Sequence, residues 1–157
     1  MGNFSVAYSA AVARLQYHAQ AGRILQGFKI ITDVTKEVFG KADFPHVKVM
    51  MPSLTETLDG NILKLEIRLQ FVCSTWNKGS SLDQILAVEK VADALTTAHD
   101  GTGRPDNGLA GTGYGSGRIE YGDNYGVGVN NELETSLNTN LTMVLKARAS
   151  ELANRRN

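Results

Sequence analysis

The sequence predicts a single α+β domain spanning residues 1–157, with an N-terminal helical region and one helix packed on one face of an antiparallel or mixed sheet of long strands. Two observations carry this prediction. Two long stretches alternate apolar and polar residues with a period of two, and an amphipathic helix lies between them in the chain. A length of 157 residues corresponds to about one domain, and a hydrophobic content of 42% suffices for one core.

The first long stretch runs from Leu63 to Cys73. Its odd-numbered residues are apolar, and its even-numbered residues are polar apart from Val72. This pattern predicts a strand with one dry face and one wet face. At roughly 3.3 Å per residue the strand spans about 36 Å. Because strands usually have about 5–6 residues, this one can project beyond its own domain.

Further strands are predicted before and after it. Residues 137–147 alternate in the same way and form a second long amphipathic strand. A short strand is expected at His46–Met51, and another near Arg118–Tyr121. Between the short strand His46–Met51 and the first long strand, Pro52–Gly60 is expected to be a connection. The reason is the Asp-Gly pair at its end, which is a strong turn signal.

A helix is predicted over Ser81–His99. Ser81-Leu-Asp-Gln84 has the spacing of a capping box, in which Gln84 reaches back to the start of the helix. His99 falls in the last turn, where an imidazole complements the helix dipole. The helix presents one broad apolar face, made of Leu82, Ile85, Leu86, Val88, Val91, Ala92 and Leu95.

Residues 6–39 are also predicted to be helical, as one broken helix or two in succession. Val6, Ala10 and Tyr17 share one helical face. Gly22 and Gly27 then interrupt the pattern, since glycine costs helix stability.

Residues 100–128 hold ten of the sixteen glycines and show no helical period, which predicts an extended glycine-rich loop. At its centre lies GTGYGSG, Gly111–Gly117. Glycine runs can wrap phosphate, but a dinucleotide fingerprint needs a helix directly after the run, because phosphate binds at helix N-terminal amides. Here a predicted strand follows, so nucleotide binding is disfavoured and no cofactor is expected.

The composition excludes several other classes of site. Sixteen basic and sixteen acidic residues give a net charge of zero, which argues against a dedicated nucleic-acid-binding protein. Cys73 is alone and continues an apolar strand face, so it is expected to be buried and unreactive. His18, His46 and His99 fall on different elements, so neither a metal site nor enzymatic activity is expected. No apolar run reaches the roughly 18 residues of a membrane span.

Tyrosine and arginine in the glycine-rich segment have a different significance. A Tyr/Arg/Gly/Asn composition is typical of adaptable protein-contact surfaces. Stacking on single-stranded nucleic acid uses similar residues, but the neutral charge favours protein contact. Six residues are therefore predicted to contact other subunits or partners: Trp76, Arg104, Tyr114, Arg118, Tyr121 and Tyr125.

The order of these elements resembles the tail terminator, or tail completion, proteins of tailed bacteriophages and the related neck and head–tail joining proteins. The glycine-rich segment is longer than this family leads us to expect between its helix and its last strand. The resemblance rests on the helical region through Phe39, the strand His46–Met51, the long strand Ile62–Ser74, the turn Thr75-Trp76-Asn77, the helix Ser81–His99 and the closing strand Ser136–Arg148.

The resemblance implies a structural virion protein, assembled in the host cytoplasm, that forms a ring of identical subunits, usually six. Such a ring sits on the end of the tail tube protein, stops tube polymerisation and joins the tail to the head connector or neck proteins. Double-stranded DNA passes through its lumen without specific recognition. On this view the glycine-rich segment is an arm ordered by neighbouring subunits, so that deleting Gly108–Gly117 should leave the monomer folded but impair assembly. The alternative is a small α+β module that binds a ligand or nucleic acid through the glycine-rich loop.

Overall fold

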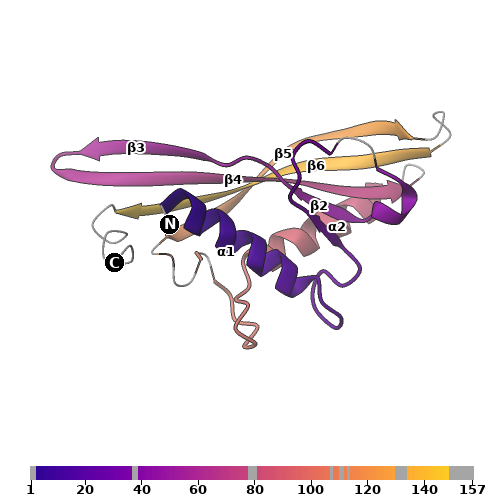
Figure 1. Cartoon of the computed structure of the whole chain (residues 1–157), viewed down its shortest axis with the longest axis horizontal. Helices are drawn as coiled ribbons and strands as arrows, with labels where there is room; N and C mark the ends of the chain where they lie inside the picture. Colours follow the sequence, from indigo (N-terminus) through magenta and orange to yellow (C-terminus); the bar gives the residue numbers. More distant parts are fainter. Residues whose placement is uncertain are drawn as a thin grey trace.

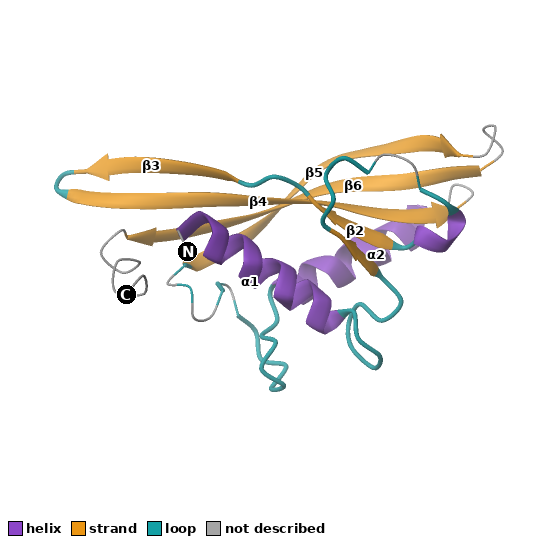
Figure 2. Cartoon of the chain, in the orientation of Figure 1, coloured by secondary structure: helices purple, strands orange, loops and turns teal. Residues whose placement is uncertain are grey.

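The computed structural model describes residues 3–36, 39–77, 81–106, 108–109, 112, 114–129 and 134–148. It confirms the predicted α+β class: two α-helices pack on a mixed six-stranded sheet (Figure 1). Both helices, α1 (Asn3–His18) and α2 (Ser81–Leu95), cover the same face of the sheet (Figure 2). This segregation leaves the other face open.

The sheet is organised around its longest strand. The strands are β1 (Lys29–Ile31), β2 (His46–Val49), β3 (Ser53–Asp59), β4 (Ile62–Asn77), β5 (Gly115–Val129) and β6 (Glu134–Arg148). Their order is β1-β2-β4-β6-β5, and β3 pairs separately with the first half of β4. Only β1 and β2 run parallel, so the sheet is mixed.

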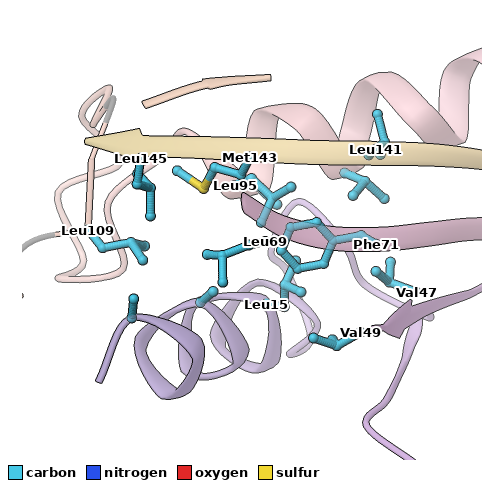
Figure 3. Packing of buried hydrophobic residues seen from close by; sticks show 14 of the residues in the cluster. Leu15, Val47, Val49, Leu69, Phe71, Leu95, Leu109, Leu141, Met143 and Leu145 are labelled. Carbon is cyan, nitrogen blue, oxygen red and sulfur yellow. The ribbon is translucent and has the colours of Figure 1, made fainter. Parts of the chain in front are cut away.

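The two predicted amphipathic strands lie side by side as β4 and β6. They pair antiparallel without a register shift, from Lys64 opposite Arg148 to Asn77 opposite Thr135. Because residues directly opposite share a face, the apolar residues of both strands gather on the helix side. There, side chains such as Leu69, Phe71 and Met143 meet the helices in one hydrophobic core (Figure 3).

The N-terminal helical region is shorter than predicted. Helix α1 ends at His18 instead of extending in broken form to residue 39. Gly22 and Gly27 adopt positive φ angles of 79° and 90°, which interrupt helical geometry and which glycine accepts without strain. After them the chain forms strand β1, where the apolar residues had indicated a helix.

The connection predicted at residues 52–60 is instead strand β3. The Asp59-Gly60 turn is confirmed: it joins β3 to β4 in a hairpin, with Gly60 at φ 62°. All seven residues of β3 are exposed, so there was little burial pattern to reveal the strand in the sequence.

The glycine-rich segment is only partly a loop. Its second half is β5, which includes the predicted strand Arg118–Tyr121 and pairs with β6. In the first half, Leu109 and Tyr114 are buried in the core. The packing of Leu109 and Tyr114 contradicts the expectation that neighbouring subunits order this arm, because these two residues lie in the core of their own chain.

A buried arginine on α1 binds the first half of this segment. Arg14 is fully buried, and its Nη1 donates hydrogen bonds to the carbonyl oxygens of Leu95 (2.8 Å) and Gly108 (3.0 Å). Its Nη2 pairs with Asp106 Oδ2 at 2.5 Å, and its Nε lies 3.4 Å from His99 Nδ1. A cation at the C-terminal end of α2 also complements the helix dipole. One side chain thus joins α1, α2 and the loop.

Replacing Arg14 with methionine should lower the free energy of unfolding by about 3–5 kcal/mol, because it leaves the carboxylate and two buried carbonyls without their donor. Urea denaturation measures the change. The exposed Arg118, which also forms an ion pair, is the matched control, and Arg118→Met should cost no more than about 1 kcal/mol. Equal losses for the two variants would contradict the central role of Arg14.

Gly108 allows its own backbone to lie close to the backbone of Tyr114 and Gly115. A Cβ at this position would lie 2.6 Å from the carbonyl oxygen of Tyr114 and 2.9 Å from Cα of Gly115. Gly108→Ala should therefore destabilise the domain by about 1–3 kcal/mol, as overpacking does. Gly115→Ala meets nothing within 4 Å and should change stability by less than about 0.5 kcal/mol. Thermal unfolding of both variants checks the pair, and a neutral Gly108→Ala would show that the loop can move away.

Candidate assembly surfaces

Trp76 lies near the end of β4 in a cluster of aromatic rings. It is half-buried, with its ring 5.5 Å from that of Phe44. Phe44 contacts His46 at 4.8 Å, and Phe39 stacks on the same imidazole at 4.4 Å. Burial lowers the pKa of His46, which favours the neutral ring in this apolar setting. The predicted contact residue Trp76 is thus largely engaged within its own chain.

The structure separates Arg104 from Tyr114. Arg104 is exposed and pairs with Asp100 at 3.5 Å in the loop after α2. Tyr114 is only 3% exposed and packs in the core, so its side chain is not available to a partner. The prediction of Tyr114 as a contact residue is therefore wrong. The sequence could not show this burial, because Tyr114 is a single tyrosine among glycines.

The remaining predicted residues, Arg118, Tyr121 and Tyr125, come together as exposed side chains of the edge strand β5. A register shift between Tyr121 and Asn124 places the two tyrosines on opposite faces. Tyr121 pairs with Leu141 on the helix side, whereas Tyr125 pairs with Asn138 on the open side. In a regular strand, residues four apart share one face. The bulge therefore gives each face of this edge one exposed tyrosine.

On the open face, charged side chains link β4 to β5 across β6. Glu120 accepts hydrogen bonds from Arg68 on β4 and, at 3.3 Å, from Arg118 on β5. The hydrogen bond from Arg68 is the main reason why the pKa of Glu120 is below its usual value. Val144 of β6 lies opposite both arginines in the register and is fully buried beneath this polar layer. The ion pairs thus form a flat, charged face of mixed sign.

On the helix side, α2 and β5 border an open groove of about 300 Å³. Ile85 and Val88 line it from α2, and Tyr121 lines it from β5. Beside the groove, the buried Gln84 donates hydrogen bonds to the carbonyl oxygen of Cys73 (3.0 Å) and to Thr139 Oγ1 (2.9 Å). Gln84 therefore anchors α2 to the sheet.

The outer face of α2 is apolar at its start. The sequence placed Leu82, Ile85 and Leu86 on the face toward the core, but they are 63%, 52% and 46% exposed. The helix buries its opposite side, which includes Val91 and Leu95. The apolar residues of α2 thus lie on both sides of the helix. One sheet covers only one of these sides. The three exposed residues are called the α2 stripe. The helix also ends at Leu95, so His99 lies beyond its last turn.

The β3–β4 hairpin forms a second uncovered surface. Residues 53–64 are all exposed, and the hairpin extends away from both helices (Figure 1). Leu58 lies directly opposite Leu63, and Leu54 opposite the core residue Ile67, so these three leucines continue the core face of the sheet. We call Leu54, Leu58 and Leu63 the hairpin patch.

The described residues contain little that indicates catalysis or ligand chemistry. Within them, no three His, Cys, Asp or Glu side chains are arranged to hold a metal ion. The glycine run leads into β5 and not into a helix, so it lacks the helix N-terminus that a phosphate loop uses. Residues 111 and 113 of that run lie outside the described part. None of the described helices has the length and apolar character needed to cross a membrane.

Comparisons with known proteins agree with this picture at the level of fold. No protein-family model matches the sequence, and no curated protein matches it. Among solved structures, the chain is similar to a chain in a structure of the "virion of native gene transfer agent (GTA) particle". The two share their fold. The match has a TM-score of 0.50 at 11% sequence identity, and it covers 92% of this chain and 98% of the other.

The burial of Cys73 generates a prediction. The thiol is fully buried on the core face of β4, and burial raises its pKa to about 12. At pH 8 only about one thiol in ten thousand is then ionised, and the thiolate is the reactive form. Native protein should therefore not react with a thiol reagent such as Ellman's reagent, whereas protein in 6 M guanidinium should release one equivalent. Rapid labelling of the native protein would contradict this packing.

Proposed function

We propose that this chain is a structural protein of a phage-like particle. In this proposal it forms a ring at the end of the tail tube, terminates tail polymerisation and joins the tail to the head connector. The observation that carries the proposal is the fold similarity to a chain of a gene transfer agent virion, because it extends over nearly the whole of both chains. The arrangement of elements in the sequence, which resembles the tail terminator family, supports the same assignment.

The shape of the surface is also suited to assembly. In the described part of the chain β3 pairs only with β4, and β5 pairs only with β6, so each leaves one edge unpaired. Unpaired edges can accept a strand from another chain. Two apolar patches on the helix side are likewise exposed. Subunits that contact one another head-to-tail close into a ring when the rotation between them fits.

The proposed partners follow from this role. Each subunit contacts identical subunits, six in the ring typical of the family, together with the tail tube protein and the connector or neck proteins. Double-stranded DNA passes through the lumen without specific contacts, which agrees with a net charge of zero, since basic proteins bind DNA strongly regardless of sequence. The protein is located in the virion after assembly in the host cytoplasm. It acts without catalysis, metal or cofactor.

The alternative, a ligand- or nucleic-acid-binding module that uses the glycine-rich loop, is less favoured. Leu109 and Tyr114 of that loop are buried, and Arg14 binds the loop from beneath. The segment is thus committed to the core. Titration with ATP, NAD and oligonucleotides should leave the melting temperature unchanged, whereas specific binding would raise it.

Imaging tests the proposed function directly. Electron microscopy of particles carrying an epitope-tagged copy of this chain should locate a ring, six-fold in the simplest case, between tail tube and head. In particles that lack the chain, tails should become longer than normal or fail to join heads. Tails of normal length that still join heads without this chain would sink the proposal.

A further inference from the structure

The chain has three histidines, and their hydrogen bonds differ in what they require of the imidazole. Nε2 of His18 lies 3.0 Å from the carbonyl oxygen of Thr97. Nδ1 of His46 lies 3.1 Å from the carbonyl oxygen of Asp43. A carbonyl oxygen only accepts, so both rings donate these hydrogen bonds and can still donate them when they are protonated. His99 is placed differently, because its neighbour is itself a donor.

The contact between His99 and Arg14 requires a neutral imidazole. Nε of Arg14 faces Nδ1 of His99 at 3.4 Å. An arginine is always charged and its Nε always carries a hydrogen, so Nδ1 must offer its lone pair and the ring proton must lie on Nε2. A second proton, on Nδ1, would set two donors against each other and bring two positive charges together. Protonation of His99 therefore breaks this contact.

Titratable and charged groups face His99 from α1 and from its own loop. They are Arg14, Tyr17 and His18 of α1, and Asp100 and Asp106 of the loop after α2. The two carboxylates favour the charged ring. Burial of the ring opposes them, and so does the positive charge of Arg14, with the result that the pKa of His99 lies below its ordinary value. The surroundings as a whole therefore favour the neutral ring that the contact needs.

The loop that carries His99 is held at its base and not at its tip. Residues 96–106, called the α2 loop here, follow the last turn of the helix, and residues 100–105 are all exposed. Backbone hydrogen bonds from Ala98 (2.9 Å) and Asp106 (2.7 Å) close the base. Arg14 ties the loop to α1. A loop with an exposed tip and a small buried base belongs to the parts of a protein that open locally at low cost in free energy.

We propose that the α2 loop is a pH-sensitive switch, in which protonation of His99 releases the loop from Arg14. At neutral pH the imidazole accepts the hydrogen bond and the loop stays closed on α1. In mild acid the two cations repel each other, and the loop opens while the sheet stays folded. The loop carries the exposed Arg104, which pairs with Asp100, so opening changes how this arginine is presented at the surface. The switch operates in the isolated chain and does not depend on the proposed assembly.

The direction of the pH effect follows from the lowered pKa of His99. In the open loop the imidazole is exposed and titrates near the ordinary value of about 6.5. The closed loop therefore has its full stability above about pH 6.5 and loses stability as the pH falls below that value. Carboxylates titrate near pH 4, roughly two units lower. The ion pair between Arg14 and Asp106 thus remains charged over the range in which His99 titrates.

Hydrogen exchange measured by mass spectrometry follows the loop directly. Between pH 7.5 and pH 5.5, protection factors of peptides that cover the α2 loop should fall by about three- to tenfold, after division by the intrinsic exchange rate at each pH. The upper limit is about tenfold, because an exposed imidazole is about 90% protonated one unit below its pKa.

His99→Asn is the matched control. The amide oxygen of asparagine can accept from Arg14 as Nδ1 does, but it does not titrate. Burial lowers the pKa of His46 as well, so His46 also affects stability in mild acid. The variant retains His18 and His46, and its difference from the wild type therefore isolates His99. Loop protection in His99→Asn should match the wild type at pH 7.5 and should not fall at pH 5.5.

An NMR titration of the imidazoles supplies a second measurement, which needs the variant only for assignment. The Cε1–H resonance that is missing from His99→Asn belongs to His99, and in the wild type it should titrate below about pH 6.5. Loss of loop protection in the wild type alone, together with this low titration, supports the switch. Loop protection that persists to pH 5.5, an equal loss in His99→Asn, or a His99 resonance that titrates at or above pH 6.5 would overturn it.

Discussion

The length of β4 is the constraint on which the rest of the structure depends. Its sixteen residues pair with β2 and β3 on one side and with β6 on the other, and α2 is anchored to it through Gln84. Two helices cannot cover a strand of this length. Its first part therefore continues as an exposed hairpin that retains the leucines of a core face. One strand thus provides both the centre of the domain and an exposed hairpin with apolar side chains.

Arg14 has a complementary role, because it fixes the glycine-rich segment after α2 in one conformation. A segment rich in glycine loses much conformational entropy when it is fixed, and the buried guanidinium offsets part of that loss with hydrogen bonds to Gly108 and Asp106. Burying a charge without partners would be costly. The same side chain accepts this position only because the loop and the end of α2 surround it with acceptors. Arginine and loop therefore depend on each other.

The edge strand β5 shows how a small irregularity determines the surface. Its register shift sends Tyr121 toward the groove beside α2 and Tyr125 toward the open face. Gly122 lies at the shift, and a Cβ there would come within 3.3 Å of the Asn140 backbone oxygen. The glycines of this strand therefore allow a bulge and a close approach between strands, which differs from both a phosphate loop and a flexible arm.

The sequence by itself determined the fold class, the two long strands and α2, because a period of two or of 3.6 residues is a local signal. It also predicted Arg118, Tyr121 and Tyr125 as contact residues, because tyrosine and arginine depart from the surrounding composition; the structure shows that their side chains are exposed, and the contact itself stays a prediction. Only the tertiary structure decided the rest. The burial of Tyr114 and Arg14, the exposure of Leu82 and the strand pairing of β3 depend on which segments lie opposite one another. Periodicity records which residues share a face, but not whether another part of the chain covers it.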